Sequence, residues 1–390
     1  MIASLQASID AALAARERVR GRAVRETAHA LAVAAQRWAR DPDLAAALPA
    51  AMGLSRAMIA TVLPIVADAV DVDTLVELHA REAGRHPPDL VAHVLASNVP
   101  ALAVPAITHA VLAGSAVLVK SGRADTHSAA AFHRALGAVD RELAATVVPT
   151  YWQGGASDVE DTILDRARVI VATGGDAATL AIVRRFGSRV IAFGDRHSLA
   201  VLERDVADET LDALAADIVL YEQRGCLSPH AILVVGDDLL AIAERLMTSL
   251  GRRRRALPPP PLPVEERAAH RLAIEAAAFA GARVLDGTAG TVILDPSPRI
   301  GDAIGRRTVR LHAVRSLADV ATAFTAHAIE CIGVGPGVRL DAEALRRRGV
   351  ARLCPVGRMQ RPRIDWPRGQ RPALGALFRP AGEARIQVES

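Results

Sequence analysis

The chain is poor in aromatic residues and in cysteine. Phenylalanine, tryptophan and tyrosine make up 3% of its 390 residues, so alanine, valine and leucine must build the cores that a 51% hydrophobic composition supplies. The three cysteines, Cys226, Cys331 and Cys354, are too few and too far apart for a disulfide framework or a zinc site. We therefore expect no bound metal, and a reducing, cytoplasmic compartment.

Membrane signals are also scarce. The first helical pattern carries both arginines and acidic residues, so no signal peptide is expected. The longest apolar stretch covers residues 95–119. It is interrupted by Asn98, Pro100, Pro105, His109 and Gly114. We therefore predict soluble core there, and no membrane span.

The net charge of +4 comes from arginines spread along the chain. The one arginine run, residues 252–255, stands just before the prolines at 258–261 and is predicted to be a surface loop. No aromatic residues or recognised module accompany it, so we expect no nucleic-acid partner.

Residues 1–85 alternate alanine-rich helical patterns with polar breaks, and strands and helices alternate strictly from Leu90 onward. The predicted strands are 90–96, 116–120, 146–151, 168–172 and 189–193. The predicted helices are 101–113, one from a Thr126 cap to about 144, one from a Ser157–Glu160 capping box to about 167, and one closed by Gly187. Short, almost wholly apolar strands in this alternation predict an α/β fold with a doubly wound parallel sheet.

A second α/β unit is expected beyond residue 225. Its predicted elements are strand 231–235, helices 239–249 and 265–280, strand-like segments 283–285, 291–294 and 308–314, helix 317–327 and a strand near 332. The chain is thus divided into an N-terminal helical segment (1–85) that packs on a first α/β domain (86–225), a second domain (226–352) and an irregular C-terminal wrap (353–390).

Several polar or glycine residues fall at the carboxyl ends of predicted strands, where doubly wound sheets bind ligands. They are Asn98, Lys120, Gly174, Gly175 and Gly194. No G-x-G-x-x-G follows the first strand, so the ordinary dinucleotide fingerprint is missing. The shared position predicts a cleft. Each residue also has a structural explanation, with Asn98 as a helix cap, Lys120 as a solvated lysine and the glycines as tight turns.

The most informative stretch is EQRGCLSP, residues 222–229. A helical pattern with Asp208 as its expected cap ends at Gly225, and a strand follows, so Cys226 is predicted to lie at a helix-to-strand corner. A thiolate at such a corner suits nucleophilic acyl transfer. A buried structural cysteine is the alternative.

Other reactive side chains have mainly structural interpretations. Cys354 is the rival nucleophile, although its apolar surroundings predict packing, and Cys331 is predicted to be core. His197 and His230 are candidate acid–base groups, although lone histidines are more often structural.

Six stretches stand in an order that matches a known family. They are LASNVPA (95–101), VLVKSG (117–122), VATGGD (171–176), FGDRHSLAVL (193–202), EQRGCLSP (222–229) and LCPVGRMQRP (353–362). In these stretches the chain resembles the LuxC-type acyl-CoA reductases of bacterial bioluminescence, a branch of the aldehyde dehydrogenase superfamily. The resemblance implies an aldehyde dehydrogenase-like fold, with a nicotinamide cofactor on residues 86–225 and the nucleophile on residues 226–352.

The resemblance also implies roles for single residues. Cys226 matches the thiol nucleophile, and Asn98 matches the side chain of the oxyanion hole. Lys120 matches the lysine on the adenosine ribose. The turn near the phosphates and the nicotinamide ribose comprises Thr173, Gly174 and Gly175, with Gly194 counted among the cofactor-binding residues. Arg123 stands where NAD-preferring relatives carry a glutamate, so NADPH is the expected cofactor, with a plain surface arginine as the alternative.

Two departures from the superfamily refine the expected activity. Ala192 stands where aldehyde dehydrogenases carry the glutamate that activates the deacylating water, and no E-x-F-G-P stretch is present. The resemblance therefore implies reduction of an acyl thioester, from acyl-CoA or an acyl-carrier protein, to an aldehyde. The alternatives are an acyl-phosphate reductase of the glutamyl-phosphate type and a non-catalytic scaffold. Homo-oligomers, and a partner enzyme that transfers the acyl group or consumes the aldehyde, are compatible with the sequence.

Overall fold

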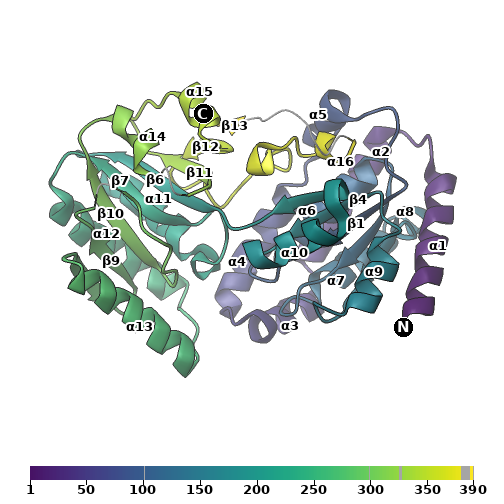
Figure 1. Cartoon of the computed structure of the whole chain (residues 1–390), viewed down its shortest axis with the longest axis horizontal. Coiled ribbons are helices and arrows are strands. Elements are labelled where there is room, and N and C mark those ends of the chain that lie inside the picture. Colours follow the sequence, from purple (N-terminus) through teal and green to yellow (C-terminus); the bar gives the residue numbers. More distant parts are fainter. Residues whose placement is uncertain (101, 298, 325–326, 379–386, 390) are drawn as a thin grey trace. The chain divides into compact units, whose positions relative to one another are not determined.

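The computed structural model describes residues 1–100, 102–297, 299–324, 327–378 and 387–389, which form two compact units (Figure 1). The first unit comprises Met1–Asp195 and the described residues from Arg363 to Phe378; the second comprises Arg196–Pro362 and residues 387–389. The units meet in sequence at Asp195, before the expected junction near residue 225. The reason is a strand absent from the sequence prediction, β6 (His197–Glu203), which pairs with two strands of the second unit.

The first unit is built on a parallel sheet with the strand order β3-β2-β1-β4-β5. Its strands are β1 (Leu90–Val94), β2 (Ala116–Lys120), β3 (Val147–Thr150), β4 (Val169–Thr173) and β5 (Val190–Phe193). The predicted doubly wound parallel sheet is confirmed. Short, mainly apolar strands are typical of such a sheet, because helices cover both of its faces. The order doubles back beside β1, which is the switch point of such sheets.

Helices cover the sheet of the first unit. They are α1 (Ile2–Val19), α2 (Val24–Ala39), α3 (Pro42–Met52), α4 (Arg56–Asp68), α5 (Val72–Glu82), α6 (Ala103–Leu112), α7 (Ser128–Gly137), α8 (Arg141–Ala144), α9 (Ser157–Leu164) and α10 (Asp176–Phe186), with the short 3-10 helix η1 (Gly187–Arg189). Leu5 and Ile9 of α1 pack in one core with Leu118 of β2 and Ile163 of α9. Among the described residues no single helix is long and apolar enough to cross a membrane; the pair α3 and α4, bent by 120°, meets the length and composition criteria together.

Two predicted helix caps are wrong. The N-cap of α7 is His127 and not Thr126, and the Oδ1 of Asp125 accepts the N–H of Ser128 at 2.9 Å. The helix ends at Gly137, and α8 follows as a separate helix. The expected start of α6, Ala101, lies outside the described residues.

The capping box expected at α9 is also absent. Ala156 is the N-cap and makes no side-chain cap bond. Glu160 instead accepts the N–H of Gly155 at 3.2 Å and pairs with Arg185 of α10. Its carboxylate therefore ties a loop and a second helix to α9.

The second unit is built on a mixed sheet with the order β13-β12-β11-β6-β7-β10-β9-β8. Besides β6, its strands are β7 (Pro229–Val235), β8 (Arg283–Gly287), β9 (Gly290–Leu294), β10 (Thr308–Val314), β11 (Ile329–Val334), β12 (Arg352–Pro355) and β13 (Gln387–Val388). Its helices are α11 (Asp208–Val219), α12 (Leu239–Ala256), α13 (Val264–Phe279), α14 (Val320–Ala323) and α15 (Ala342–Arg347), with the 3-10 helices η2 (Leu220–Gln223) and η3 (Leu317–Asp319). Only β8 and β9 pair antiparallel among the named strands of the described residues.

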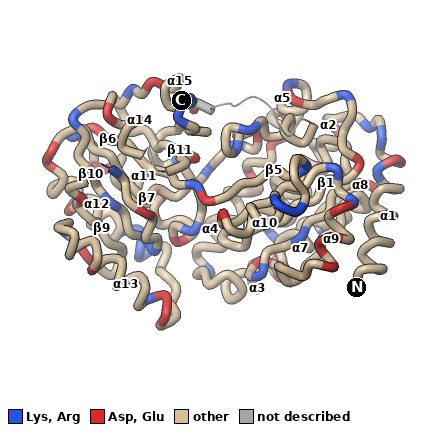
Figure 2. The backbone as a smooth tube through the Cα atoms, in the orientation of Figure 1, with Lys and Arg blue, Asp and Glu red and all other residues tan. Residues whose placement is uncertain are grey.

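The arginine run at 252–255 lies in the last turns of α12, and not in the predicted loop. Arg252 pairs at 2.5 Å with Asp212 of α11, which offsets a small part of the repulsion within this run of like charges. Figure 2 shows the same pattern more widely, with basic and acidic residues interspersed along both units. The predicted helix 317–327 is shorter than expected and is divided between η3 and α14, with residues 325–326 outside the description.

The C-terminal segment is more regular than predicted and serves both units. It supplies β12 to the second sheet. It then supplies the 3-10 helix η4 (Arg368–Gln370) and α16 (Gly375–Phe378) to the first unit. The backbone N–H groups of Leu374 and Gly375 donate to Glu82 at 2.9 and 3.1 Å, and α16 lies beside α5 (Figure 1).

Candidate active site

Most of the predicted first-unit residues lie at the carboxyl edge of the parallel sheet. Lys120 ends β2, Thr173 ends β4, and Asn98 lies in the loop after β1. Gly174 and Gly194 directly follow β4 and β5. Because all five strands run in parallel, these positions share one edge, where doubly wound folds bind ligands.

The loops that follow β1 and β2 are in close contact. A Cβ at Gly122 would come within 2.6 Å of the Ser97 Cβ, so only glycine fits there. Asn98 is exposed next to this contact. The N-cap of α6 is Leu102, so Asn98 is not the cap of that helix, and the structural explanation offered by the sequence falls away.

Lys120 is not a solvated strand-end lysine. It is only 8% exposed, and its Nζ lies 5.8 Å from the centroid of the Tyr151 ring. Burial lowers the pKa of Lys120, while the charge of Glu160 raises it. Arg123, three residues further on, is exposed in the loop.

The turn after β4 is closed by two aspartates. The N–H of Asp176 donates to Asp195 at 3.1 Å, and the N–H of Asp195 donates to Asp176 at 2.9 Å. A Cβ at Gly194 would lie 2.0 Å from Asp176 Oδ1, so this clasp requires glycine there. Gly175 is the N-cap of α10, whose first turn thus already faces a carboxylate. Close packing against Asp176 therefore explains the glycine at position 194, a reason that the sequence did not suggest.

In the second unit, Cys226 lies half-buried in the turn before β7. The preceding helix ends at Val219, and not at Gly225 as predicted. Between them, Tyr221, Glu222 and Gln223 have φ angles of 57°, 53° and 57°. Consecutive left-handed residues other than glycine are strained and persist only when their surroundings hold them.

A buried ion pair holds the middle of this left-handed segment. Arg307 Nε donates to Glu222 Oε2 at 2.9 Å, and Arg307 Nη2 donates to the other oxygen. The two residues are 1% and 3% exposed. A bidentate pair in such a setting fixes the orientation of both side chains.

An amide side chain locks the next residue. Gln223 Nε2 donates to the carbonyl oxygens of Pro229 and Thr308 at 2.9 and 3.1 Å. Its Oε1 accepts the N–H of Thr308 at 2.7 Å. Gln223 thereby joins the start of β7 to the start of β10.

The turn at Cys226 is also held from two other elements. Ser198 Oγ of β6 donates to the carbonyl oxygen of Cys226 at 2.6 Å. Gln360 Nε2 donates to Ser228 Oγ at 2.8 Å. The thiol therefore stands on a backbone fixed on both sides, as a nucleophile that must keep its geometry requires.

Sequence reasoning missed Glu222, Gln223, Arg307 and Gln360 as residues that position Cys226. The available signal was a charged and an amide side chain directly after the apolar residues 218–221. Their partners Arg307 and Thr308 lie 85 residues away, so no local pattern could identify them.

The predicted histidines belong to a cluster of three. The His197 ring lies 6.0 Å from that of His230 and 4.7 Å from that of His327. Burial lowers the pKa of His230 to about 4, with the charge of His197 adding to the effect. His230 is therefore neutral near pH 7 and is poorly suited to donate a proton as an imidazolium.

The other two cysteines are core residues, as predicted. Cys331 and Cys354 are both fully buried, with their Sγ atoms 3.5 Å apart on neighbouring strands. Burial raises the pKa of the Cys331 thiol. Neither sulfur has the access that a nucleophile needs.

A buried carboxyl lies behind the Cys226 turn. Asp217 of α11 accepts the N–H of Gly357 at 2.5 Å, and its carbonyl oxygen accepts from Gln360 at 3.1 Å. Burial raises the pKa of Asp217 from 3.8 to about 7, although backbone hydrogen bonds oppose the shift. The charge on the Asp217 carboxyl, which contacts the segment that carries Gln360, therefore changes near neutral pH.

We predict that this carboxyl makes stability fall as pH rises from about 4 to 7. In that window the unfolded chain loses the Asp217 proton before the folded chain does, which stabilises the unfolded state by up to roughly 1.4 kcal/mol per pH unit. This destabilisation is absent below about pH 4 and complete above about pH 7. Urea unfolding of wild type and Asp217→Asn across this window should show the decline in wild type and a smaller one in the variant; parallel curves would contradict it.

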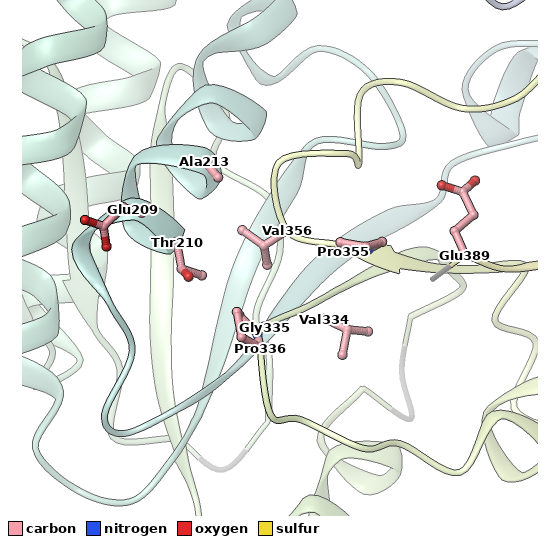
Figure 3. A pocket seen from close by; sticks show the side chains of 9 residues that line it. All are labelled: Glu209, Thr210, Ala213, Val334, Gly335, Pro336, Pro355, Val356 and Glu389. Atoms are coloured by element: carbon pink, nitrogen blue, oxygen red, sulfur yellow. The ribbon is translucent and has the colours of Figure 1, made fainter.

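A pocket of about 410 Å³ lies elsewhere in the second unit. Figure 3 shows Val334, Pro336 and Val356 around it, with Glu209 of α11 to one side. Val334 ends β11 and Pro336 follows it, and Val356 follows the end of β12, whereas Cys226 precedes the amino end of β7. Because β12, β11, β6 and β7 are parallel, the pocket lies at the opposite edge of the sheet from the thiol.

The side chains of the second unit are suited to thiol chemistry. Within the described ranges, no group of three or more His, Cys, Asp or Glu residues is placed to hold a metal ion. A half-buried thiol on a rigid turn can attack an acyl carbon, and a fixed backbone supplies N–H groups to an oxyanion.

The sequence of this chain is similar to those of reductases of acyl thioesters. The family model for acyl-CoA reductase (LuxC) matches residues 71–373. The long-chain acyl-protein thioester reductase of Aliivibrio fischeri is 26% identical over 282 residues, which are 70% of this chain and 59% of that protein. The chain spans about half to three fifths of the length of such curated relatives.

Solved structures show the same fold. Aldehyde dehydrogenase 21 from Physcomitrella patens, solved with the product succinate, has a TM-score of 0.75 at 16% identity, over 97% of this chain and 88% of that one. Succinic semialdehyde dehydrogenase from Streptococcus pyogenes, solved with NADP+, has a TM-score of 0.68 at 15% identity, over 85% and 81%. The predicted aldehyde dehydrogenase-like fold is confirmed.

Proposed function

Because the chain belongs to the acyl-CoA reductase (LuxC) family, we propose that it reduces an acyl thioester to an aldehyde through an acyl-enzyme on Cys226. The observation that carries the proposal is the half-buried Cys226 thiol on a turn held by the Glu222–Arg307 pair. The name of the Aliivibrio fischeri relative, an acyl-protein thioester reductase, supports the same chemistry.

The first half-reaction is acyl transfer between two sulfurs. The Cys226 thiolate attacks the thioester carbonyl, and the donor thiol leaves, because the two sulfurs are comparable leaving groups. Asn98 is assigned as an oxyanion donor, an interaction whose loss costs about 3 kcal/mol in comparable sites. We propose that the acyl donor is acyl-CoA or an acyl-carrier protein.

The cofactor proposed for the second half-reaction is NADPH, which when bound supplies hydride to the acyl carbon. The donor set at the carboxyl edge of the first sheet fits a phosphorylated dinucleotide. It offers a buried ammonium at Lys120, a guanidinium at Arg123, a hydroxyl at Thr173 and the open backbone of Gly174. Lys120 would hold the adenosine ribose, and Arg123 the 2′-phosphate.

Ala192 favours reduction over hydrolysis. It lies half-buried on β5 and offers no carboxylate to activate water, so the acyl-enzyme should persist until hydride arrives. This distinguishes the proposed reductase from an aldehyde dehydrogenase of the same fold, which oxidises aldehydes to acids.

Mass spectrometry of the intact protein tests the proposal. After incubation with acyl-CoA and no cofactor, the protein should gain the mass of one acyl group while free thiol is released. Adding NADPH should remove the adduct and yield aldehyde. No adduct at any chain length, or release of free acid as fast as NADPH-driven turnover, would exclude this reaction.

The charge at position 123 should decide between the two nicotinamide cofactors. Arg123→Glu should weaken NADPH binding about ten- to a hundredfold and NADH binding little, because a carboxylate repels the 2′-phosphate that a guanidinium binds. Dissociation constants for both cofactors measure the effect.

The matched control is Arg184→Gln, in an exposed arginine of the last turn of α10. It should change neither constant. Equal losses for both cofactors in Arg123→Glu, or a wild type that prefers NADH, would remove Arg123 from the binding site.

A further inference from the structure

The C-terminal segment carries an arginine back to the ligand edge of the first sheet. Arg368 opens η4, where Gly369 and Gln370 have φ angles of 56° and 64° and turn the chain tightly. The segment is anchored on both sides. Ile364 is bonded through its carbonyl oxygen to His109 Nε2 at 2.9 Å, and Leu374 donates to Glu82. The position of Arg368 is therefore fixed by the fold.

The Arg368 side chain lies against the carboxyl ends of β4 and of the edge strand β5. Its guanidinium carbon is 4.5 Å from the centroid of the Phe193 ring, at the end of β5. Its Nη1 lies 3.3 Å from the hydroxyl of Thr173, at the end of β4. Stacking on the ring and bonding to the hydroxyl orient the planar group, which keeps most of its five N–H donors.

In the described part of the chain, no carboxylate pairs with this guanidinium. Among the described residues, Arg368 has no acidic oxygen within 4.0 Å, although most buried or half-buried arginines of the chain are paired. The nearest turn does contain Asp176 and Asp195, but each accepts the backbone N–H of the other. Burial lowers the pKa of His93 on β1 to about 3, with the charges of His109 and Arg368 adding to the effect. Within the described residues, the Arg368 guanidinium therefore has no ion-pair partner.

We propose that Arg368 binds the pyrophosphate of the nicotinamide dinucleotide. The inference rests on the proposed function for the identity of the ligand. The first turn of α10, the usual phosphate site of such a fold, is occupied by the Asp195 carboxylate, so a phosphate near it needs a cation. Arg368 supplies that cation between β4 and β5.

Strand order supports the pyrophosphate over the 2′-phosphate. Lys120 and Arg123 follow β2, which is separated from β4 by β1. With neighbouring strands about 4.8 Å apart, Arg368 stands roughly 10 Å along the edge from the adenosine end. A dinucleotide bound along that edge places its linked phosphates near β4, and a guanidinium contacts two phosphate oxygens at once.

The test compares two ligands on the full chain. NADPH contains the pyrophosphate, whereas adenosine 2′,5′-bisphosphate contains only the adenosine end. In calorimetry Arg368→Gln should weaken NADPH binding about tenfold or more and change adenosine bisphosphate binding less than about twofold. Arg368→Lys keeps the positive charge but loses the bidentate guanidinium, so its affinity for NADPH should lie between those of wild type and Arg368→Gln. The melting temperature of each variant reports whether it is folded.

The outcomes separate this inference from the proposed function. The control Arg184→Gln should bind both ligands like wild type. Wild-type NADPH affinity in a folded Arg368→Gln overturns the inference, and so does an equal loss for both ligands, since that places the residue at the adenosine end or in a purely structural role. If Arg368→Gln does not fold, wild-type affinity in Arg368→Lys overturns it. A wild-type chain that binds neither NADPH nor NADH overturns the proposed function itself.

Discussion

Cys226→Ala should abolish acyl-enzyme formation completely, because neither of the other two thiols has the access needed to replace it. Cys331 and Cys354 are fully buried, and Cys226 alone among the three is partly accessible. Removing the nucleophile of a covalent mechanism leaves only binding and electrostatic effects, so reductive turnover should fall by several orders of magnitude. Intact-protein mass spectrometry with acyl-CoA, followed by a single-turnover assay with NADPH, measures both steps.

Cys354→Ala is the matched control. It removes a buried sulfur from a packed strand, so it should cost roughly 1–3 kcal/mol of stability and leave acylation intact. A folded Cys354→Ala variant that forms no adduct, together with an active Cys226→Ala variant, would show that the nucleophile has been misassigned.

Arg307→Met should be the most damaging change outside the nucleophile. It leaves the Glu222 carboxylate buried without its partner, which typically costs about 3–5 kcal/mol in unfolding free energy. The left-handed residues before Cys226 would also lose their anchor, so the acylation rate should fall even in the fraction that remains folded. Denaturant unfolding and the rate of adduct formation at saturating acyl-CoA measure the two effects.

An exposed ion pair provides the comparison. Arg346 pairs with Glu343 at 2.7 Å on α15, where solvent screens both charges. Arg346→Met should therefore leave stability and acylation nearly unchanged. If Arg307→Met proves equally mild, the buried pair does not hold the Cys226 turn.

Local sequence determined the layered architecture of the first unit. Its strands are short, apolar runs separated by amphipathic helices, and this pattern follows from burial on both faces. It also placed Lys120, Thr173 and Gly174 at strand ends, since a strand boundary is marked by the residues around it. Cys226 could be identified because its neighbours Gly225 and Pro229 mark a corner.

Helix boundaries were harder to predict from the sequence. Several nearby polar side chains can bond the free N–H groups at a helix start, and at α7 the Asp125 carboxylate bonds the N–H of Ser128, where a Thr126 cap was expected. The end of α11 could not be read from Gly225, because the chain leaves the helix at Val219 through left-handed residues that local preference disfavours.

Only the tertiary structure decided what fixes the nucleophile and what faces the ligand edge. The left-handed backbone at Glu222 persists because the buried Arg307, 85 residues later, pairs with the Glu222 carboxylate and holds the side chain in place. Arg368 reaches Thr173 across 195 residues of sequence, because the chain returns to its first unit after completing the second. Such pairings depend on long-range chain topology and on the low dielectric of the interior, neither of which leaves a periodic signal in the sequence.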